Sequence, residues 1–252
     1  MISTEAVVLQ ELNPQIVQIT MQDRAGKNTF SQELLTGLLQ AFERIRADRG
    51  YRVVVITGYD TYFCSGGNQE TLLLLHEGRA RFTDVNIYAA ALDCQIPVIA
   101  AMQGHGIGGG FVFGLFADFI VMSRESVYTT NFMKYGFTPG MGATWVLPYK
   151  LGPVLGAEML LSARTYHGAE LQRRGVPFPV VPRVEVLEYA RELAYDIAAK
   201  PRDSLIELKS HLVADARTRL PAIIEQETRM HQRTFHQPEV RQRIQTSFGS
   251  QT

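Results

Sequence analysis

The chain has 252 residues, of which 46% are hydrophobic, and 25 basic side chains balance 25 acidic ones. This length suits one large α/β domain or two small ones, and the apolar content is sufficient for a packed core. The balanced charge excludes a global field that would favour nucleic acid or an anionic membrane surface. Two cysteines are too few for a disulfide framework, and the amino terminus lacks the features of a signal peptide, so we expect a cytoplasmic protein.

The first half of the chain predicts a mostly parallel sheet. Residues 7–21 alternate in places and predict two strands, after which Ser31 can cap an amphipathic helix. Further strands, β-branched and with little polar alternation, are predicted at 52–57, 97–102 and 119–122. Such runs are typical of parallel strands buried on both faces. A helix is expected after Gly108, so strands and crossover helices alternate, which indicates the α/β class.

The segment 96–122 is apolar enough to raise the question of a membrane span. Gln103, His105 and Asp118 interrupt it, and six glycines lie in its middle. A buried strand, a glycine-rich turn and a buried helix explain it better, so no membrane partner is expected.

After Pro139 the pattern becomes helical, and only 178–181 predicts a strand. The predicted helices cover 143–150, 153–162, 168–174, 184–200, 204–213 and 220 to about 248. We therefore expect an α/β core over residues 1–190 and a helical carboxy-terminal region over 191–252.

Two distant stretches each follow a β-like run and place bare backbone where a helix begins. They are 63–68, FCSGGN, and 104–110, GHGIGGG. Glycine lets the main chain approach a ligand closely, and the free N–H groups of a first helical turn point outward with the positive end of the helix dipole behind them. The pair predicts a two-amide oxyanion hole, which stabilises negative charge on a thioester oxygen.

These motifs resemble the crotonase (enoyl-CoA hydratase/isomerase) superfamily over essentially the whole chain. VVITG at 54–58 with FCSGG is similar to the family's first oxyanion loop, IPVIAAMQG at 96–104 with GGG to the second, and YGFTPGMGA at 135–143 to its glycine-proline turn. The resemblance implies a spiral of ββα turns ending in helices that mediate trimer formation. It also implies that the oxyanion donors are the backbone N–H groups of Gly67 and Gly109.

The departures from the family concern the chemistry. Hydratases carry two glutamates that handle water, and by spacing these positions hold Val112 and Lys134 here. Neither side chain can act as the carboxylate base, so hydration is not expected. Decarboxylation suits such a hole, because loss of CO₂ leaves the electron pair on carbon and makes the enolate without proton removal. The catalyst then needs a cation for the substrate carboxylate and one proton donor.

For the cation we select Arg81, in the stretch 68–88 that is expected to be a helix lining the acyl pocket. A guanidinium can clamp a carboxylate through two hydrogen bonds. A solvated helix-end arginine is the alternative for Arg81 and the favoured interpretation of Arg79. Lys134 is a second candidate, although its side chain could turn away from the pocket.

For the proton donor we select His231 on the carboxy-terminal helix. It lies four residues before Phe235, which resembles the family's inward-facing aromatic residue, so both share one helix face. An imidazolium has a pKa suited to proton transfer near neutrality. His236 faces elsewhere, and His105 is expected to be a packing or turn residue. The histidines and cysteines show no metal-ligand spacing, and no metal or other cofactor is expected.

Within the superfamily, MQDR at 21–24, KYGFTPGMG at 134–142 and the missing glutamates are most similar to the decarboxylating second hydratase-like enzymes of polyketide β-branching cassettes. The resemblance implies 3-methylglutaconyl on the phosphopantetheine of an acyl carrier protein as substrate and a 3-methylcrotonyl-type thioester as product. Arg24 and Lys27 match the place where the family meets the phosphate end of pantetheine. Two exposed cations after a strand are the alternative interpretation. The implied partners are the carrier protein and two further copies in a homotrimer.

Two other functions stay open. A crotonase double-bond isomerase would use the same hole with His231 as a mobile base. A non-catalytic crotonase-fold scaffold could bind an acyl carrier, but it would have no need of bare backbone at both loops.

Overall fold

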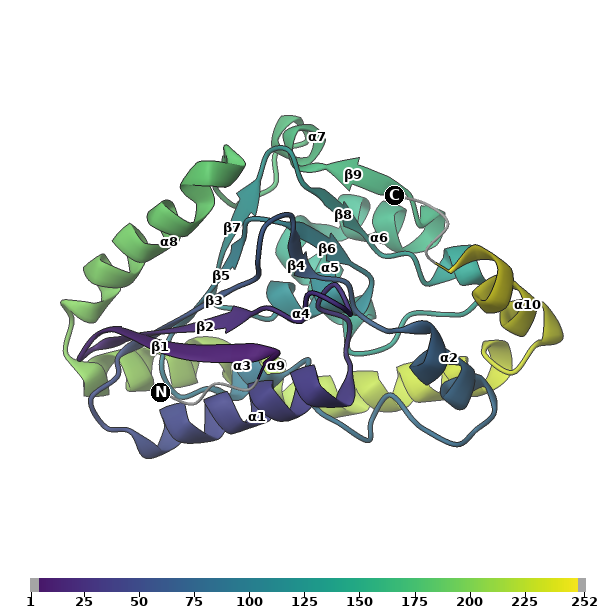
Figure 1. Ribbon diagram of the computed structural model, residues 1–252, viewed down its shortest axis with the longest axis horizontal. Helices are drawn as coiled ribbons and strands as arrows, with labels where there is room; N and C mark the ends of the chain where they lie inside the picture. Colours follow the sequence, from purple (N-terminus) through teal and green to yellow (C-terminus); the bar gives the residue numbers. More distant parts are fainter. Residues whose placement is uncertain (1–4, 249–252) are drawn as a thin grey trace.

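The computed structural model describes residues 5–248 and contains a main sheet with a parallel centre (Figure 1). In order across the sheet, its strands are β1 (Val7–Asn13), β2 (Ile16–Met21), β3 (Val53–Thr57), β5 (Val98–Met102), β7 (Phe119–Ser123) and β10 (Val180–Val181). Only β1 and β2 pair antiparallel in this sheet, within the part of the chain that the structure describes. Every residue of β3 and β5 is buried, as the β-branched runs predict for strands covered on both faces.

A second, smaller sheet stands beside the first. Its strands are β4 (Tyr62–Cys64), β6 (His105–Ile107), β8 (Val127–Thr129) and β9 (Thr165–His167), with β4, β6 and β8 parallel. The sequence did not predict them, because three residues are too few to show alternation. Each of β4, β6 and β8 follows a main-sheet strand and precedes a helical segment. The repeat confirms the predicted spiral of ββα turns.

The helices surround the two sheets. They are α1 (Gln32–Ala47), α2 (Gln69–His76), α3 (Ala90–Asp93), α4 (Gly109–Leu115), the 3₁₀ turn η1 (Met133–Tyr135), α5 (Ala143–Leu151), α6 (Pro153–Ser162), α7 (Gly168–Arg173), α8 (Arg183–Ala198), α9 (Arg202–Thr234) and α10 (Pro238–Ser247). The predicted cap of α1 is confirmed, since Ser31 Oγ accepts a hydrogen bond from the N–H of Leu34 at 3.2 Å. No helix within residues 5–248 is long and apolar enough to cross a bilayer.

The long helix α9 differs from its prediction. It runs unbroken for 33 residues through Pro221, whereas the sequence predicted separate helices at 204–213 and from 220 to about 248. Leu220 is buried beside that proline and packs against the turn at Gly142, which holds the helix on the core. The predicted helix end at Gln237-Pro238 is confirmed, because the chain turns at 235–237 and Pro238 starts α10, so the stretch expected as helical to about 248 is divided there.

The stretch 68–88 is helical only over α2. Gly78 follows with a φ of +70°, a left-handed conformation that ends the helix, and the chain runs irregularly to Ala89. Arg81 therefore lies on a loop and not on a helix.

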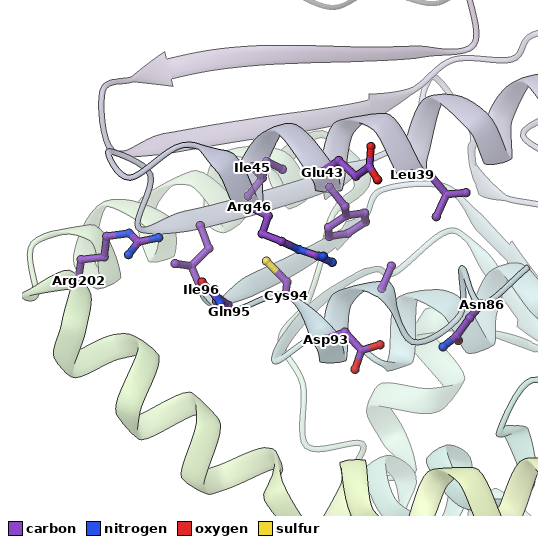
Figure 2. Close-up of a pocket in the computed structure, with 12 residues that line it drawn as sticks. Leu39, Glu43, Ile45, Arg46, Asn86, Asp93, Cys94, Gln95, Ile96 and Arg202 are labelled. Carbon is purple, nitrogen blue, oxygen red and sulfur yellow. The ribbon is translucent and has the colours of Figure 1, made fainter.

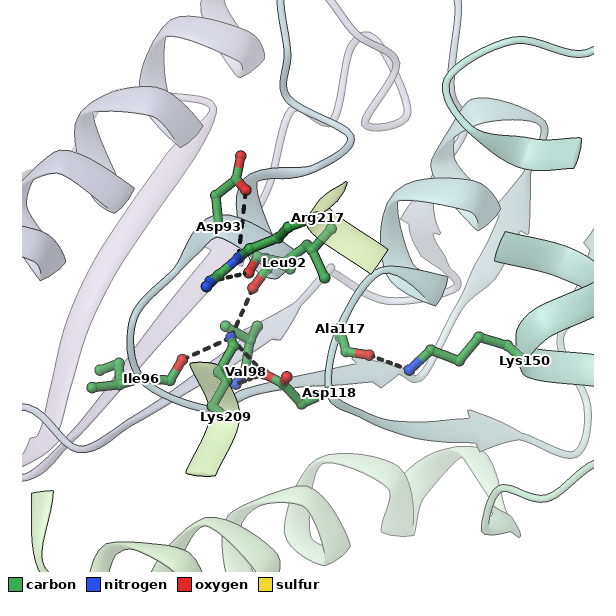
Figure 3. A network of polar contacts seen from close by, with 10 residues as sticks. Leu92, Asp93, Ile96, Val98, Ala117, Asp118, Lys150, Lys209 and Arg217 are labelled. Carbon is green, nitrogen blue, oxygen red and sulfur yellow. Dashed lines mark hydrogen bonds and ion pairs between the residues drawn. The ribbon is translucent and has the colours of Figure 1, made fainter. Parts of the chain in front are cut away.

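Buried polar contacts fix the first half of α9 against the sheet (Figure 3). The Lys209 ammonium lies 2.7 Å from the Asp118 carboxylate and donates to the carbonyls of Ala91 and Ile96 at 2.9 and 3.0 Å. Two turns further on, Arg217 donates to the Leu92 carbonyl at 2.7 Å. The second half of α9 reaches α10, which packs beside α2 (Figure 1).

The predicted division at residue 190 falls inside α8. Val186, Ala190 and Ala194 are buried against the outer face of the main sheet, so α8 belongs to the packing of the core on both sides of that boundary. The trimerisation role of residues 191–252 stays a prediction.

Candidate active site

Pairing of β4 with β6 brings the two glycine loops into contact. A Cβ atom at Gly66 would lie 2.9 Å from the nitrogen of Gly109 and 3.0 Å from that of Gly110, and a Cβ atom at Gly110 would lie 2.2 Å from the carbonyl oxygen of Cys64. Gly66 also has a φ of +72°, which L side chains rarely adopt. The loops can lie this close only because both positions lack side chains.

The two predicted oxyanion donors belong to these loops. Gly109 is the first residue of α4, and the preceding Gly108 has a φ of 55° and supplies no side-chain cap. Gly67 directly precedes Asn68, whose side chain caps α2 by accepting from Thr71 N at 2.7 Å. Among the described residues, neither the Gly67 nor the Gly109 N–H donates a hydrogen bond. Both are thus available to a ligand.

A turn at 138–142 forms the wall opposite the second loop. A Cβ atom at Gly109 would meet Met141 Sδ at 2.7 Å and Phe30 Cε2 at 3.0 Å. Met141 has a φ of 62°, so the backbone of this turn is held in an unusual conformation to place its thioether there.

Asn28 braces the first loop, and the sequence analysis missed it. Its side chain is fully buried and donates to the carbonyls of Met21 and Phe63 at 3.0 and 2.9 Å, and its own carbonyl accepts from Ser65 N at 3.1 Å. Its φ of 53° explains the residue type, because asparagine tolerates left-handed backbone better than most residues. A polar residue between two turn residues gave no clear signal in the sequence.

Arg24 and Lys27 lie on the loop that Asn28 holds. Both are exposed, Arg24 pairs with Asp60 at 2.5 Å and covers the Tyr59 ring at 4.7 Å, and the Lys27 ammonium lies 5.7 Å from the Tyr62 ring centre. The structure places them on one surface beside the first oxyanion loop.

His231 is buried on α9 among aromatic rings. Its ring centre lies 4.4 Å from that of Phe82 and 5.5 Å from that of Phe235, and Nε2 donates to the carbonyl of Thr138. Burial lowers the pKa of His231 to about 4, although the backbone carbonyls of Thr138 and Pro139 act in the opposite direction. The resting imidazole is therefore neutral near pH 7, and the imidazolium suggested by the sequence is not its resting form.

A small cavity of about 10 Å³ adjoins His231, enough for about one water molecule. Its lining residues are Phe82, Thr83, Tyr88, Gly140, Met141, Ile224, Glu227, Thr228 and His231. Met141 connects the cavity to Gly109, so the cavity lies beyond the oxyanion hole, where the acyl end of a thioester would extend.

Glu227 is a second residue that the sequence analysis missed. Its side chain is buried, and its carboxylate accepts from Gly142 N at 2.7 Å, Thr144 N at 2.9 Å and Thr144 Oγ1 at 2.6 Å. Burial raises the pKa of Glu227, and these hydrogen bonds oppose the rise. The one signal in the sequence is its position four residues before His231, which places both on one helix face.

Arg81 directly precedes Phe82, one of the residues that line the cavity. Its side chain is exposed, its backbone N–H donates to Asp84 Oδ2 at 2.8 Å, and its guanidinium makes no ion pair within residues 5–248. Arg79, by contrast, pairs with Glu77 at 3.3 Å.

The two positions predicted by spacing for hydratase glutamates lie on different elements. Val112 is fully buried in α4, and Lys134 lies on η1, where its carbonyl accepts from Arg243 of α10 at 3.1 Å. The side chains that approach the second oxyanion loop from this segment are those of Asn131 and Phe132, beside Gly108. His105 accepts from Val127 N through Nδ1 at 3.1 Å, consistent with a packing role.

A larger cavity of about 160 Å³ lies between α1 and α3 (Figure 2). Its lining includes Arg46 and Cys94 but no residue of either glycine loop. Burial raises the pKa of the Cys94 thiol, which disfavours a reactive thiolate. Among the described residues no group of three or more His, Cys, Asp or Glu side chains could hold a metal ion.

The family model described as enoyl-CoA hydratase/isomerase matches residues 11–248. The chain belongs to this family. Bacillaene synthase decarboxylase PksI of Bacillus subtilis (strain 168) is 61% identical to it over 98% of this chain and all of the relative. A solved structure from a dehydratase/decarboxylase enzyme couple involved in polyketide β-branching has a TM-score of 0.96 at 61% identity, covering 97% of this chain and 99% of that chain.

The ECH2 decarboxylase domain of CurF from Lyngbya majuscula is similar as well. Its TM-score is 0.93 at 47% identity, covering 97% of this chain and all of that domain. These likenesses confirm the predicted family, the crotonase fold and the decarboxylase class of the enzyme.

Proposed function

We propose that the chain decarboxylates 3-methylglutaconyl carried by an acyl carrier protein and releases a 3-methylcrotonyl-type thioester in polyketide β-branching. The observation that carries the proposal is the pair of N–H groups at Gly67 and Gly109, which donate no hydrogen bond among the described residues. They lie beside a small cavity whose lining, among the described residues, contains one carboxylate, that of Glu227. The hydrogen bonds from Gly142 and Thr144 occupy Glu227, which leaves it unsuited to activate water.

The reaction follows from this arrangement. The thioester oxygen accepts from the Gly67 and Gly109 N–H groups, and the distal carboxylate is bound by Arg81, which directly precedes Phe82 of the cavity lining. The bond between the carboxylate carbon and its neighbour breaks, CO₂ leaves, and the electron pair moves into a dienolate whose charge the hole stabilises. A proton then returns to carbon from His231.

His231 must first acquire that proton. In the unliganded protein its imidazole is neutral, because its pKa is about 4. A substrate carboxylate nearby, and then the dienolate, raise the pKa by adding opposite charge. Substrate binding therefore brings a proton with it, and kcat/KM should fall as the pH rises above about 5, by up to tenfold per unit. A kcat/KM that stays flat between pH 5.5 and 7.5 would exclude His231 as the donor.

The carrier protein approaches from the side of Arg24 and Lys27. Both are exposed beside the first oxyanion loop, so they can meet the phosphate of phosphopantetheine and acidic side chains of the carrier. The reaction needs no metal or redox cofactor. The assembly is a homotrimer formed through residues 191–252, in the cytoplasm.

The deciding experiment is mass spectrometry of 3-methylglutaconyl-loaded acyl carrier protein after incubation with the wild type, Arg81→Ala and His231→Ala. Loss of CO₂ with the wild type and its collapse in both variants would support the reaction and both roles. An unchanged mass with the wild type would reject the decarboxylase.

A crotonase isomerase is the second candidate, and the neutral state of His231 favours it. The hydrogen bond to Thr138 assigns the proton to Nε2, so Nδ1 carries a lone pair that could accept a proton from carbon. Incubation of a 3-methylcrotonyl thioester, which lacks the distal carboxylate, in D₂O separates the two. Deuterium incorporation at a rate comparable with turnover would favour the isomerase.

A further inference from the structure

Helix α5 begins without a cap of its own, and Glu227 supplies one from α9. The residue before α5 is Gly142, which has no side chain to accept from the first N–H groups of the helix. Glu227 accepts from Gly142 N, Thr144 N and Thr144 Oγ1 instead, at 2.6–2.9 Å. A carboxylate at a helix amino terminus is also favoured by the helix dipole.

The same face of α9 holds the other end of this turn. His231 lies one helical turn after Glu227 and donates to the carbonyl of Thr138. Residues 138–144 are therefore bound to α9 at both ends. Between them, Gly140 leaves room for the imidazole, since a Cβ atom there would lie 2.8 Å from His231 Cε1.

The middle of the segment 138–144 contacts the oxyanion hole. Met141 Sδ lies 2.7 Å from where a Cβ atom of Gly109 would stand, so the turn packs directly on the amino end of α4. The path from Glu227 through the turn to Gly109 thus fixes how far His231 stands from the hole.

We infer that Glu227 is a positioning residue that sets the distance between His231 and the oxyanion hole, and thereby selects the carbon of the dienolate that receives the proton. This inference rests on the proposed decarboxylation. Protonation at the γ carbon gives the α,β-unsaturated product, and protonation at the α carbon gives the β,γ-unsaturated product. The α and γ carbons belong to one conjugated system and are separated only by the β carbon, so a small displacement of His231 changes the outcome.

The rest of α9 stays docked without Glu227. Lys209 and Arg217 anchor the helix to the carbonyls of Ala91, Ile96 and Leu92 (Figure 3), and Lys209 lies about 27 Å from Glu227 along the helix axis. Loss of Glu227 therefore releases the turn at 138–144 and leaves the position of the helix as a whole unchanged.

The test compares the products of Glu227→Gln, Glu227→Ala and Thr144→Val by chromatography and mass spectrometry. Misplacement of a reacting group by about 1 Å lowers rates up to about 100-fold, so we expect kcat to fall about tenfold in Glu227→Ala and less in the other two. The ratio of the two unsaturated products should change severalfold in the same order. Glu227→Gln and Thr144→Val keep the side-chain volume and so provide folded protein.

Arg217→Ala is the matched control on the same helix. It removes the hydrogen bond to Leu92 and should lower the thermal stability, but the product ratio should equal that of the wild type. A wild-type product ratio in all three test variants, with CO₂ loss intact, would overturn the positioning role. Absence of CO₂ loss from the wild type itself would instead reject the proposed function.

Discussion

The ring of Phe82 lies on the imidazole of His231, with centres 4.4 Å apart. Arg81 precedes Phe82, so the loop that carries the candidate carboxylate clamp is packed directly on the candidate proton donor. Phe82 and His231 are 149 positions apart in the chain, and both line the same small cavity. Decarboxylation requires a cation and a proton donor near the same acyl chain, and under the proposed function Arg81 and His231 take these two roles.

Replacement of Arg81 tests the clamp. Arg81→Ala should lower kcat/KM for 3-methylglutaconyl-loaded carrier by about 10- to 100-fold, because hydrogen bonds between charged partners contribute about 1.5–3 kcal/mol. Arg81→Lys keeps the positive charge but cannot form two parallel hydrogen bonds, so its kcat/KM should lie between those of the wild type and Arg81→Ala. Arg79→Ala is the matched control, since Arg79 already pairs with Glu77. Equal losses in Arg79→Ala and Arg81→Ala would contradict the assignment.

Addition of a methyl group at Gly109 tests the oxyanion hole. In Gly109→Ala the new Cβ atom would stand 2.7 Å from Met141 Sδ and 3.0 Å from Phe30 Cε2, so either these side chains or the loop must shift. Loss of one oxyanion donor lowers kcat by about 10²- to 10³-fold, and we expect a loss of that order in single-turnover assays.

Gly78→Ala serves as the control for this substitution. Gly78 has a φ of +70° with no atom within 4 Å of a Cβ position, so the variant adds backbone strain without a collision. It should lower stability slightly and leave kcat unchanged. A comparable loss of kcat in Gly78→Ala would show that strain, and not the hole, accounts for the effect.

The main sheet could be predicted from the sequence because strands buried on both faces need long β-branched runs, as at β3 and β5. The second sheet could not, since β4 and β6 have three residues each and are set by pairing between distant segments. The sequence predicted a break near residues 214–219 that α9 does not have, again because contacts with distant segments decide the structure. Pro221 disfavours a helix locally, but burial of Leu220 against the core outweighs that preference.

The glycine loops of the site could be predicted because an oxyanion hole requires backbone without side chains, and glycine is visible in the sequence. Asn28 and Glu227 act through hydrogen bonds to the backbone of other segments, Phe63 and Gly142 among them, which leave no pattern in a single sequence. The protonation state of His231 was also out of reach, because it depends on burial by Phe82 and Phe137, which come from other segments of the chain.

The Lys209–Asp118 pair should be important for stability. Both side chains are largely buried, so Lys209→Met leaves an uncompensated carboxylate, and we expect a loss of about 3–5 kcal/mol in the free energy of unfolding. Asp118→Asn in the same protein should recover part of this loss. Arg219→Ala removes an exposed pair with Asp215 on the same helix and should change stability by less than about 1 kcal/mol in urea denaturation. Similar losses of unfolding free energy in Lys209→Met and Arg219→Ala would argue against a structural role for the buried pair.

The titration of His231 should appear in the pH dependence of stability. Its pKa is about 4 in the folded protein and about 6.5 when unfolded, so the unfolded chain binds the proton more readily as the pH falls. The stabilisation is therefore fully present above pH 6.5 and is lost toward pH 4, by about 3 kcal/mol in total. In His231→Phe that part of the pH dependence should vanish in urea denaturation measured between pH 7.5 and 4.5.

The difference in pH-dependent stability between the wild type and His231→Phe gives the contribution of His231. The raised pKa of Glu227 acts in the opposite direction, because its neutral form is favoured by folding, but it is present in both proteins. His211→Ala removes an exposed histidine of the same helix and should retain the wild-type curve. Parallel losses of stability in wild type and His231→Phe as the pH falls would show that burial does not hold this imidazole neutral. His231 would then already carry its proton in the unliganded protein, and no proton would be taken up when the substrate binds.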